Sequence, residues 1–193
     1  ILGNFGTTSA ADRALGSFAR TTPAGDQFLQ LAIKNDSGSP ITTFQLTYTG
    51  EEWRSSDGRV QQLTLWCSAT NATSGFVSMG SAFTFNSPNN TGSGQIDGNA
   101  AGNRTVISGT FTPATPIAAG STVYIRWYDI NDNGIADDYL AIDDLSFGLP
   151  VPAANILTFG PGAIITGTNI AWYVPNGSDV TSLKPTYTLS PGA

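Results

Sequence analysis

Hydrophobic and polar residues alternate along most of this 193-residue chain, as in β-strands that bury one face. The alternation is clearest in residues 41–48, 60–69 and 123–128. The apolar positions that share a face are Phe44, Leu46 and Tyr48 in the first segment, Leu63, Leu65 and Cys67 in the second, and Val123, Ile125 and Trp127 in the third. We expect these nine side chains to point into a common core.

The same reasoning predicts further strands at residues 27–35, 75–85, 105–112 and 139–147. Clusters of Gly, Pro, Asn and Ser separate the segments and predict turns between them. Short strands at this spacing are typical of an all-β fold, here an antiparallel β-sandwich of the jelly-roll-like kind. Residues 9–18 allow one helical turn, and no other segment has the 3.6-residue period of a helix.

A proline-containing segment divides the chain into two parts. We expect a sandwich over residues 1–148, an extended linker over 149–154 and a second β unit over 155–193. An immunoglobulin-like sandwich needs about 100 residues and seven strands, so the second unit is expected to be a partial Ig-like domain. Its missing strands would have been removed, or would come from another copy or a neighbouring domain by strand complementation. The chain starts at Ile1 without Met, which suggests a processed or excised piece of a longer protein.

Composition narrows the possible chemistry. The chain has no His and a single Cys, which excludes His-dependent nucleophilic catalysis and His or thiolate metal sites. A net charge of -6 makes nucleic acid an improbable partner, and no run of 18 apolar residues predicts membrane insertion. The chain is rich in Ser, Thr and Gly and has few lysines, a composition that is common in exported bacterial surface proteins. We therefore expect an extracellular location at the bacterial cell surface.

The negative charge is concentrated in one place, since six of the 14 acidic residues lie between Asp129 and Asp144. The spacing D-x-N-x-N-G-x-x-D resembles the first part of a calcium loop, although Leu140 stands where an EF-hand has its bidentate acid. The predicted ligands of a structural Ca²⁺ are Asp129, Asn131, Asn133, the Ile135 carbonyl and Asp137, with Asp143 or Asp144 closing the shell. The alternative is a solvated Asn-Gly hairpin without metal.

Aromatic residues offer a second candidate site, because several of them could form a platform for a sugar: Trp53, Trp66, Trp127, Trp172, Tyr48, Tyr124, Tyr128 and Tyr139. Trp66, Tyr124 and Tyr128 lie on faces opposite the predicted core, and Arg126 shares the side of the two tyrosines. Exposed rings of this kind can stack on the sugars of a polysaccharide. Glu51 and Glu52 are neighbours on a strand and point to opposite faces, so we expect them to join a strand-end salt-bridge and packing cluster with Trp53 and Arg54 rather than a catalytic pair.

Five motifs in order carry a family resemblance. They are DRALGS at residues 12–17, YTGEEWR at 48–54, DGNAAGNR at 97–104, RWYD at 126–129 and LAIDDLS at 140–146. Together, over residues 5–147, they resemble β-sandwich modules of secreted bacterial surface proteins, which occur in adhesin-like proteins and beside extracellular nuclease and lamin-tail domains. The last motif is also similar to carbohydrate-binding and MAM-type jelly rolls, in which an Asp of the last strand helps to hold calcium. Residues 155–193 resemble the start of the Ig-like repeats of such proteins.

These observations lead to an expected function. The chain is expected to be a non-enzymatic structural or adhesive module of an extracellular bacterial surface or filament protein, with calcium stiffening the acidic loop. The alternative is a carbohydrate-binding module attached to a polysaccharide-active enzyme. The expected partners are other copies or neighbouring domains in the first case and a polysaccharide in the second.

Overall fold

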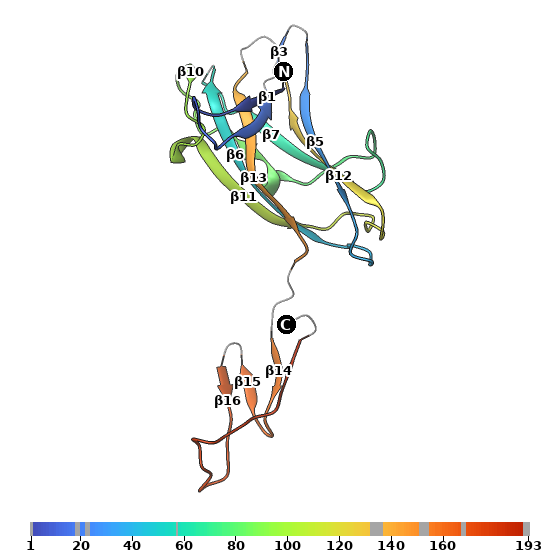
Figure 1. Ribbon diagram of the computed structural model, residues 1–193, viewed down its shortest axis with the longest axis vertical. Helices are drawn as coiled ribbons and strands as arrows, with labels where there is room; N and C mark the ends of the chain where they lie inside the picture. The colour runs from blue at the N-terminus through green and yellow to red at the C-terminus, as the bar shows by residue number, and fades with distance from the viewer. Residues whose placement is uncertain are drawn as a thin grey trace. The chain divides into compact units, whose positions relative to one another are not determined.

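The computed structural model describes residues 2–17, 20–21, 24–56, 58–131, 137–150, 155–166 and 169–190. The chain forms two compact units, Ile1–Leu149 and Pro150–Ala193 (Figure 1). The helices of the described residues are two short 3-10 turns, η1 (Ser81–Phe83) and η2 (Ala101–Asn103). The all-β prediction is confirmed.

Two antiparallel sheets build the first unit (Figure 1). The first sheet contains β1 (Leu2–Phe5), β2 (Ala14–Ser17), β13 (Tyr139–Gly148), β6 (Phe44–Ser55) and β10 (Gly94–Gln95) in that order, with β11 (Arg104–Phe111) also paired to β6. The second contains β5 (Gln27–Lys34), β12 (Thr122–Asp129), β7 (Gln62–Ser68) and β8 (Val77–Ser78), with β9 (Phe85–Asn86) also paired to β7. A small hairpin pairs β3 (Arg20–Thr21) with β4 (Ala24–Gly25).

The core lies where the predicted alternation places it. All nine apolar residues of the three clearest segments are buried and belong to one hydrophobic cluster. At its centre the rings of Tyr48 and Trp127 meet edge to face at 5.7 Å between centroids. The Tyr48 hydroxyl donates a hydrogen bond of 2.7 Å to the Phe83 carbonyl, so this polar group keeps a partner inside the core.

Two local predictions are wrong. The segment expected to allow a helical turn instead forms β2, whose Gly16 packs so closely on β13 that a Cβ would overlap Ala141. The strand expected over residues 75–85 is broken into β8, η1 and β9. Gly80 interrupts it with a φ of 91°, a conformation that costs residues with a Cβ more than glycine. The break lets Phe83 and Phe85 enter the core.

The pairing of β13 with β6 is irregular at two places, between Tyr139 and Leu140 and between Asp143 and Ser146. At the second, Asp144 has a φ of 50°, in the left-handed region that is sparsely used by residues with a side chain. Such bulges redirect side chains at the surface of a sheet. Leu140 and Ile142 of β13 face the main core, whereas Ala141 packs with Trp53 and Tyr139 on the other side of the sheet.

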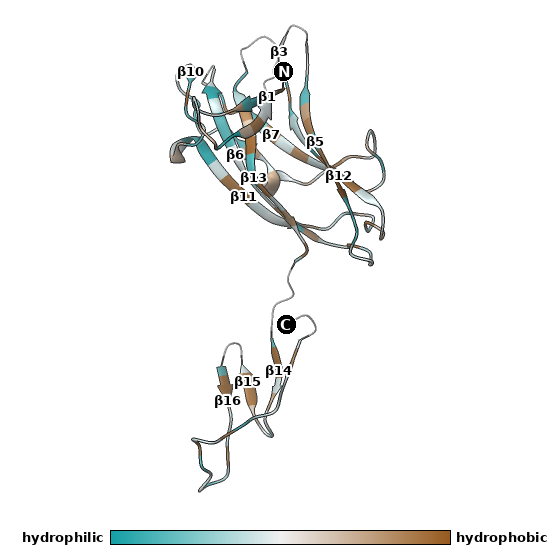
Figure 2. Ribbon diagram, in the orientation of Figure 1, coloured by the Kyte–Doolittle hydropathy of each residue, from teal (hydrophilic) through white to brown (hydrophobic). Residues whose placement is uncertain are grey.

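In its described residues the second unit contains two small antiparallel sheets of two strands each. One pairs β14 (Ile156–Phe159) with β17 (Tyr187–Leu189), and the other pairs β15 (Ile164–Thr166) with β16 (Asn169–Ala171). Hydrophobic residues make up much of β14, β15 and β16 (Figure 2), yet many stay exposed, including Leu157 and Ile164. The partial Ig-like character of this unit remains a prediction.

Candidate functional site

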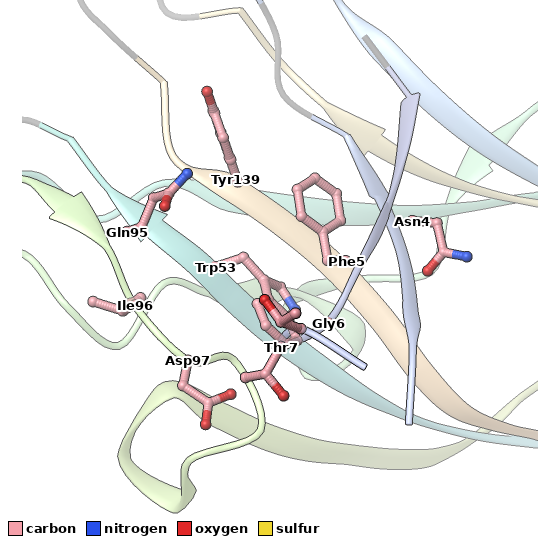
Figure 3. A pocket seen from close by; sticks show the side chains of 10 residues that line it. Asn4, Phe5, Gly6, Thr7, Trp53, Gln95, Ile96, Asp97 and Tyr139 are labelled. Carbon is pink, nitrogen blue, oxygen red and sulfur yellow. The ribbon is translucent and has the colours of Figure 1, made fainter. Parts of the chain in front are cut away.

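A groove of about 490 Å³ crosses the solvent-facing side of the first sheet. We call it the β1–β10 groove. Its lining residues come from the end of β1 and the residues after it, from β6 and β13, and from β10 and the residues after it. They are Asn4, Phe5, Gly6, Thr7, Thr8, Trp53, Gln95, Ile96, Asp97 and Tyr139. Small-molecule sites usually measure about 300–1,000 Å³. Figure 3 shows Gln95 and Tyr139 at one end and Asp97 and Thr7 at the other, with Trp53 between them.

The floor of the groove is a rigid aromatic cluster. The Trp53 ring stacks on Phe5 with 6.3 Å between centroids, and Phe5 lies 5.9 Å from the Tyr139 ring. Gly98 packs against the indole so closely that a Cβ would overlap its five-membered ring. The indole Nε1 donates a hydrogen bond of 2.9 Å to Glu51 Oε2. Trp53 is therefore held in place, while Phe5 and Tyr139 remain half-buried and offer ring surface to the groove.

The wall that follows β1 is fixed by one arginine. Arg13 Nε donates to Asn4 Oδ1 at 2.8 Å, and its terminal nitrogens donate to the carbonyls of Asn4 and Thr7. Gly6 lies directly against the guanidinium, because a Cβ at this position would contact it at 2.6 Å. Because Gly6 has no side chain, the guanidinium of Arg13 can lie against the backbone directly after Phe5.

The opposite wall continues the sheet. Gln95 pairs with Arg54 in β6, and the Ile96 backbone N–H donates to the Trp53 carbonyl at 3.1 Å. Arg54 crosses the sheet with its guanidinium 5.3 Å from the Tyr139 ring centre, within the range of a cation–π contact. The wall after β10 is therefore tied to β6, and the wall after β1 is tied by Arg13 and by the pairing of β1 with β2. These contacts make the groove preformed rather than assembled from loose loops.

A cluster of acidic residues adjoins the groove on the same side of the sheet. Glu51 lies opposite Ala141 and Arg104 in the register of β6 with its neighbours. Burial raises the pKa of Glu51, and the charges of Asp143 and Asp12 raise it further against the opposing hydrogen bond from Trp53. Burial also raises the pKa of Asp143, and the neighbouring carboxyl groups of Asp12 and Asp144 act in the same direction. Glu51 is only 1% exposed, so its carboxylate supports Trp53 rather than facing the groove.

Glu52 belongs to a different environment, as expected for adjacent residues of a strand. Its Oε2 accepts hydrogen bonds from the backbone N–H and the side-chain amide of Asn89, at 2.8 and 3.0 Å. Burial raises its pKa, and the nearby charge of Asp138 acts in the same direction. The expected strand-end cluster forms only in its packing part, since Glu51 accepts the Trp53 hydrogen bond near the end of β6. In place of the expected salt bridges, Glu51 and Glu52 accept hydrogen bonds from the uncharged Trp53 and Asn89.

The predicted calcium ligands lie in two places. Asp129, Asn131 and Asp137 are buried near one end of the sandwich, where Asp129 accepts a hydrogen bond from Ser17 and the Asn131 N–H donates to Asp26. Asn133 and Ile135 lie outside the described residues.

The other predicted ligands, Asp143 and Asp144, are further along β13. Thr49 pairs with Asp143 in the strand register, and its hydroxyl donates to the Asp144 carboxylate at 3.1 Å. Within the ranges that the structure describes, no three acidic side chains converge into a metal site.

The predicted aromatic residues of the second sheet do share a face with Arg126, but the guanidinium of Arg126 is already bound by groups of the protein. Arg126 lies between the rings of Phe28 and Phe76, with its guanidinium carbon 4.2 and 3.9 Å from their centres. Its nitrogens donate to Gln30, to the Tyr128 hydroxyl and to the Ala72 carbonyl. Trp66, Tyr124 and Tyr128 are half-buried on this side. Arg126 therefore fastens the segment around Ala72 to the sheet.

Sequence reasoning missed most of the groove. Trp53 and Tyr139 were among the aromatic residues that could form a sugar platform, but the predicted site was placed at Trp66, Tyr124, Tyr128 and Arg126. Phe5 and Gln95 carried no predicted binding role. The available signal was the alternation of β6, which places Glu51 and Trp53 on the face opposite Leu46 and Tyr48. The partners of Trp53 come from segments about 40 residues or more away in the chain, which alternation within one strand cannot indicate.

Comparisons with known proteins leave the family open: no family model matches the chain, and neither a curated protein nor a solved structure matches it. No helix in the described part of the chain is long and apolar enough to cross a membrane.

Proposed function

We propose that the first unit is a non-catalytic glycan-binding module that gives an extracellular bacterial surface protein an adhesive function. The observation that carries this proposal is the β1–β10 groove, a preformed channel in which ring surface from Phe5 and Tyr139 lies among the polar side chains of Asn4, Thr7 and Gln95. Sugars present apolar C–H faces and a rim of hydroxyls, and this combination of rings and hydrogen-bonding groups complements both.

The carboxylates favour binding without cleavage. Glycoside hydrolysis generally needs two carboxyl groups about 5–9.5 Å apart that flank the scissile bond. Among the ten residues that line the groove, Asp97 is the one with a carboxyl group. Glu51 lies next to the floor, but it is buried and accepts the Trp53 hydrogen bond, so it has no access to a sugar.

The test is a binding measurement that compares the two aromatic faces. Wild-type protein, Tyr139→Ala and Gln95→Ala are titrated by calorimetry with soluble polysaccharides that bind in an initial array screen. We expect each substitution in the groove to weaken binding by about tenfold or more, the equivalent of losing roughly 1.4 kcal/mol. Gln95 is exposed, so its replacement leaves the fold intact and separates binding from stability.

Tyr124→Ala serves as the matched control, because Tyr124 is a half-buried tyrosine of the second sheet. Its binding is expected to equal that of the wild type. If Tyr124→Ala loses binding and Tyr139→Ala retains it, the site is the second-sheet face instead. If the wild type binds none of the polysaccharides, the proposal is wrong.

A further inference from the structure

The charge of the β1–β10 groove comes from a single side chain. Of its ten lining residues, all of which are described, Asp97 carries the one charge and none is Lys or Arg. Two arginines adjoin the groove, and the hydrogen bonds of both are made to groups of the protein itself. Arg13 bonds Asn4 and Thr7, and Arg54 bonds Ser56 and the Asp137 carbonyl.

Asp97 is held in a defined position at one end of the groove (Figure 3). Its Oδ1 accepts the Asn99 backbone N–H at 3.1 Å, and its carbonyl accepts the Ala100 N–H and the Asn103 side-chain amide at 3.1 and 2.8 Å. The side chain is nevertheless exposed, so the carboxylate retains capacity for further hydrogen bonds. A carboxylate with two oxygens can accept hydrogen bonds from two adjacent hydroxyls, and charge assistance makes such bonds stronger than neutral ones.

We propose that the groove selects neutral glycans and discriminates against uronate-containing or sulfated ones, with Asp97 as the specificity-determining residue. The carboxylate accepts hydrogen bonds from sugar hydroxyls and repels a ligand carboxylate or sulfate, and no lining cation offsets the repulsion. This inference rests on the proposed glycan-binding function and adds the chemical class of the ligand.

The experiment uses a matched pair of ligands, a neutral gluco-oligosaccharide and the same oligosaccharide oxidised at C6 to glucuronate. We expect wild-type protein to bind the neutral member at least about tenfold more tightly, a difference of roughly 1.4 kcal/mol. In Asp97→Asn the affinity for the neutral oligosaccharide falls, because charge-assisted hydrogen bonds to its hydroxyls are lost. The ratio between the affinities for the neutral and the oxidised oligosaccharide becomes smaller. High salt also reduces this affinity ratio in the wild type, because salt screens the repulsion between solvent-exposed carboxylates.

Asp36→Asn is the matched control, since it removes one exposed carboxylate from a loop outside the groove and changes the net charge equally. It is expected to keep the wild-type preference. Equal binding of both oligosaccharides by the wild type, or an unchanged preference in Asp97→Asn, overturns this inference while the glycan-binding proposal stands. Failure of the wild type to bind either the pair or any polysaccharide of the array overturns both.

Discussion

At the scale of single residues, Arg126 illustrates how one side chain can join an aromatic cluster, a neighbouring strand and a loop. Its guanidinium lies between two phenylalanine rings and donates to three partners. We predict that Arg126→Lys lowers the free energy of unfolding by about 2–3 kcal/mol, because an ammonium cannot make these planar contacts together. Urea denaturation measures the loss. Arg104→Lys, an exposed position of β11, should change stability by less than about 0.5 kcal/mol, and equal effects would contradict the assignment.

The buried glutamates predict an unusual dependence of stability on pH. The pKa values of Glu51 and Glu52 are raised above the ordinary 4.5, mainly by burial. The folded protein therefore binds more protons than the unfolded chain above this value, and the free energy of unfolding falls as pH rises from about 4.5 through the raised pKa values. Their contribution is fully present below pH 4.5.

Denaturation of Glu52→Gln between pH 4 and 8 tests this dependence. The amide keeps an oxygen for the Asn89 hydrogen bonds and does not titrate, so we expect a flatter profile than that of the wild type. Asp36→Asn, at an exposed position, should keep the wild-type slope. A wild-type stability that rises over this range, or an unchanged slope in Glu52→Gln, would contradict the prediction.

At the scale of elements, the segment that follows β10 depends on a glycine for its position against Trp53. A Cβ at Gly98 would overlap the indole ring, so the wall of the groove would have to move outward. We predict that Gly98→Ala costs about 1–3 kcal/mol of stability, the usual range for overpacking, and weakens glycan binding. Gly102→Ala is the control, because a Cβ there meets open space. Calorimetric melting and titration of both variants check the pair, and identical behaviour would show that the wall does not depend on this contact.

The predicted calcium site in the acidic segment after β12 can be tested independently of the groove. Asp129, Asn131 and Asp137 are each buried, whereas Asp143 and Asp144 contact Thr49 further along β13. If Ca²⁺ binds to the acidic segment after β12, removal of the ion with EGTA should lower the melting temperature by several degrees, and added Ca²⁺ should restore it. Mg²⁺ should restore it less well, because it requires a smaller octahedral shell. An unchanged melting curve would favour the solvated hairpin.

At the scale of the whole molecule, alternation predicted the fold because burying one face of a strand determines its side-chain period. Tyr48, Leu65 and Trp127 were placed in the core on this basis and lie there. The groove was less accessible to prediction, because Trp53, Gln95 and Tyr139 meet through strand order and a bulge. Pairing of β13 between β2 and β6 is a long-range choice that no local pattern specifies.

The central claim is that glycans bind in the β1–β10 groove, and the four tryptophans permit a direct test. Each indole N–H gives its own signal in a proton–nitrogen NMR spectrum, and Trp53 lies in the groove whereas Trp66 lies on the second sheet. On titration with a neutral oligosaccharide, we predict shifts of the Trp53 indole and of the Thr7, Gln95 and Asp97 amides, with the Trp66 indole unchanged. Shifts at Trp66 and Tyr128 with a silent Trp53, or no shifts at all, would contradict the account.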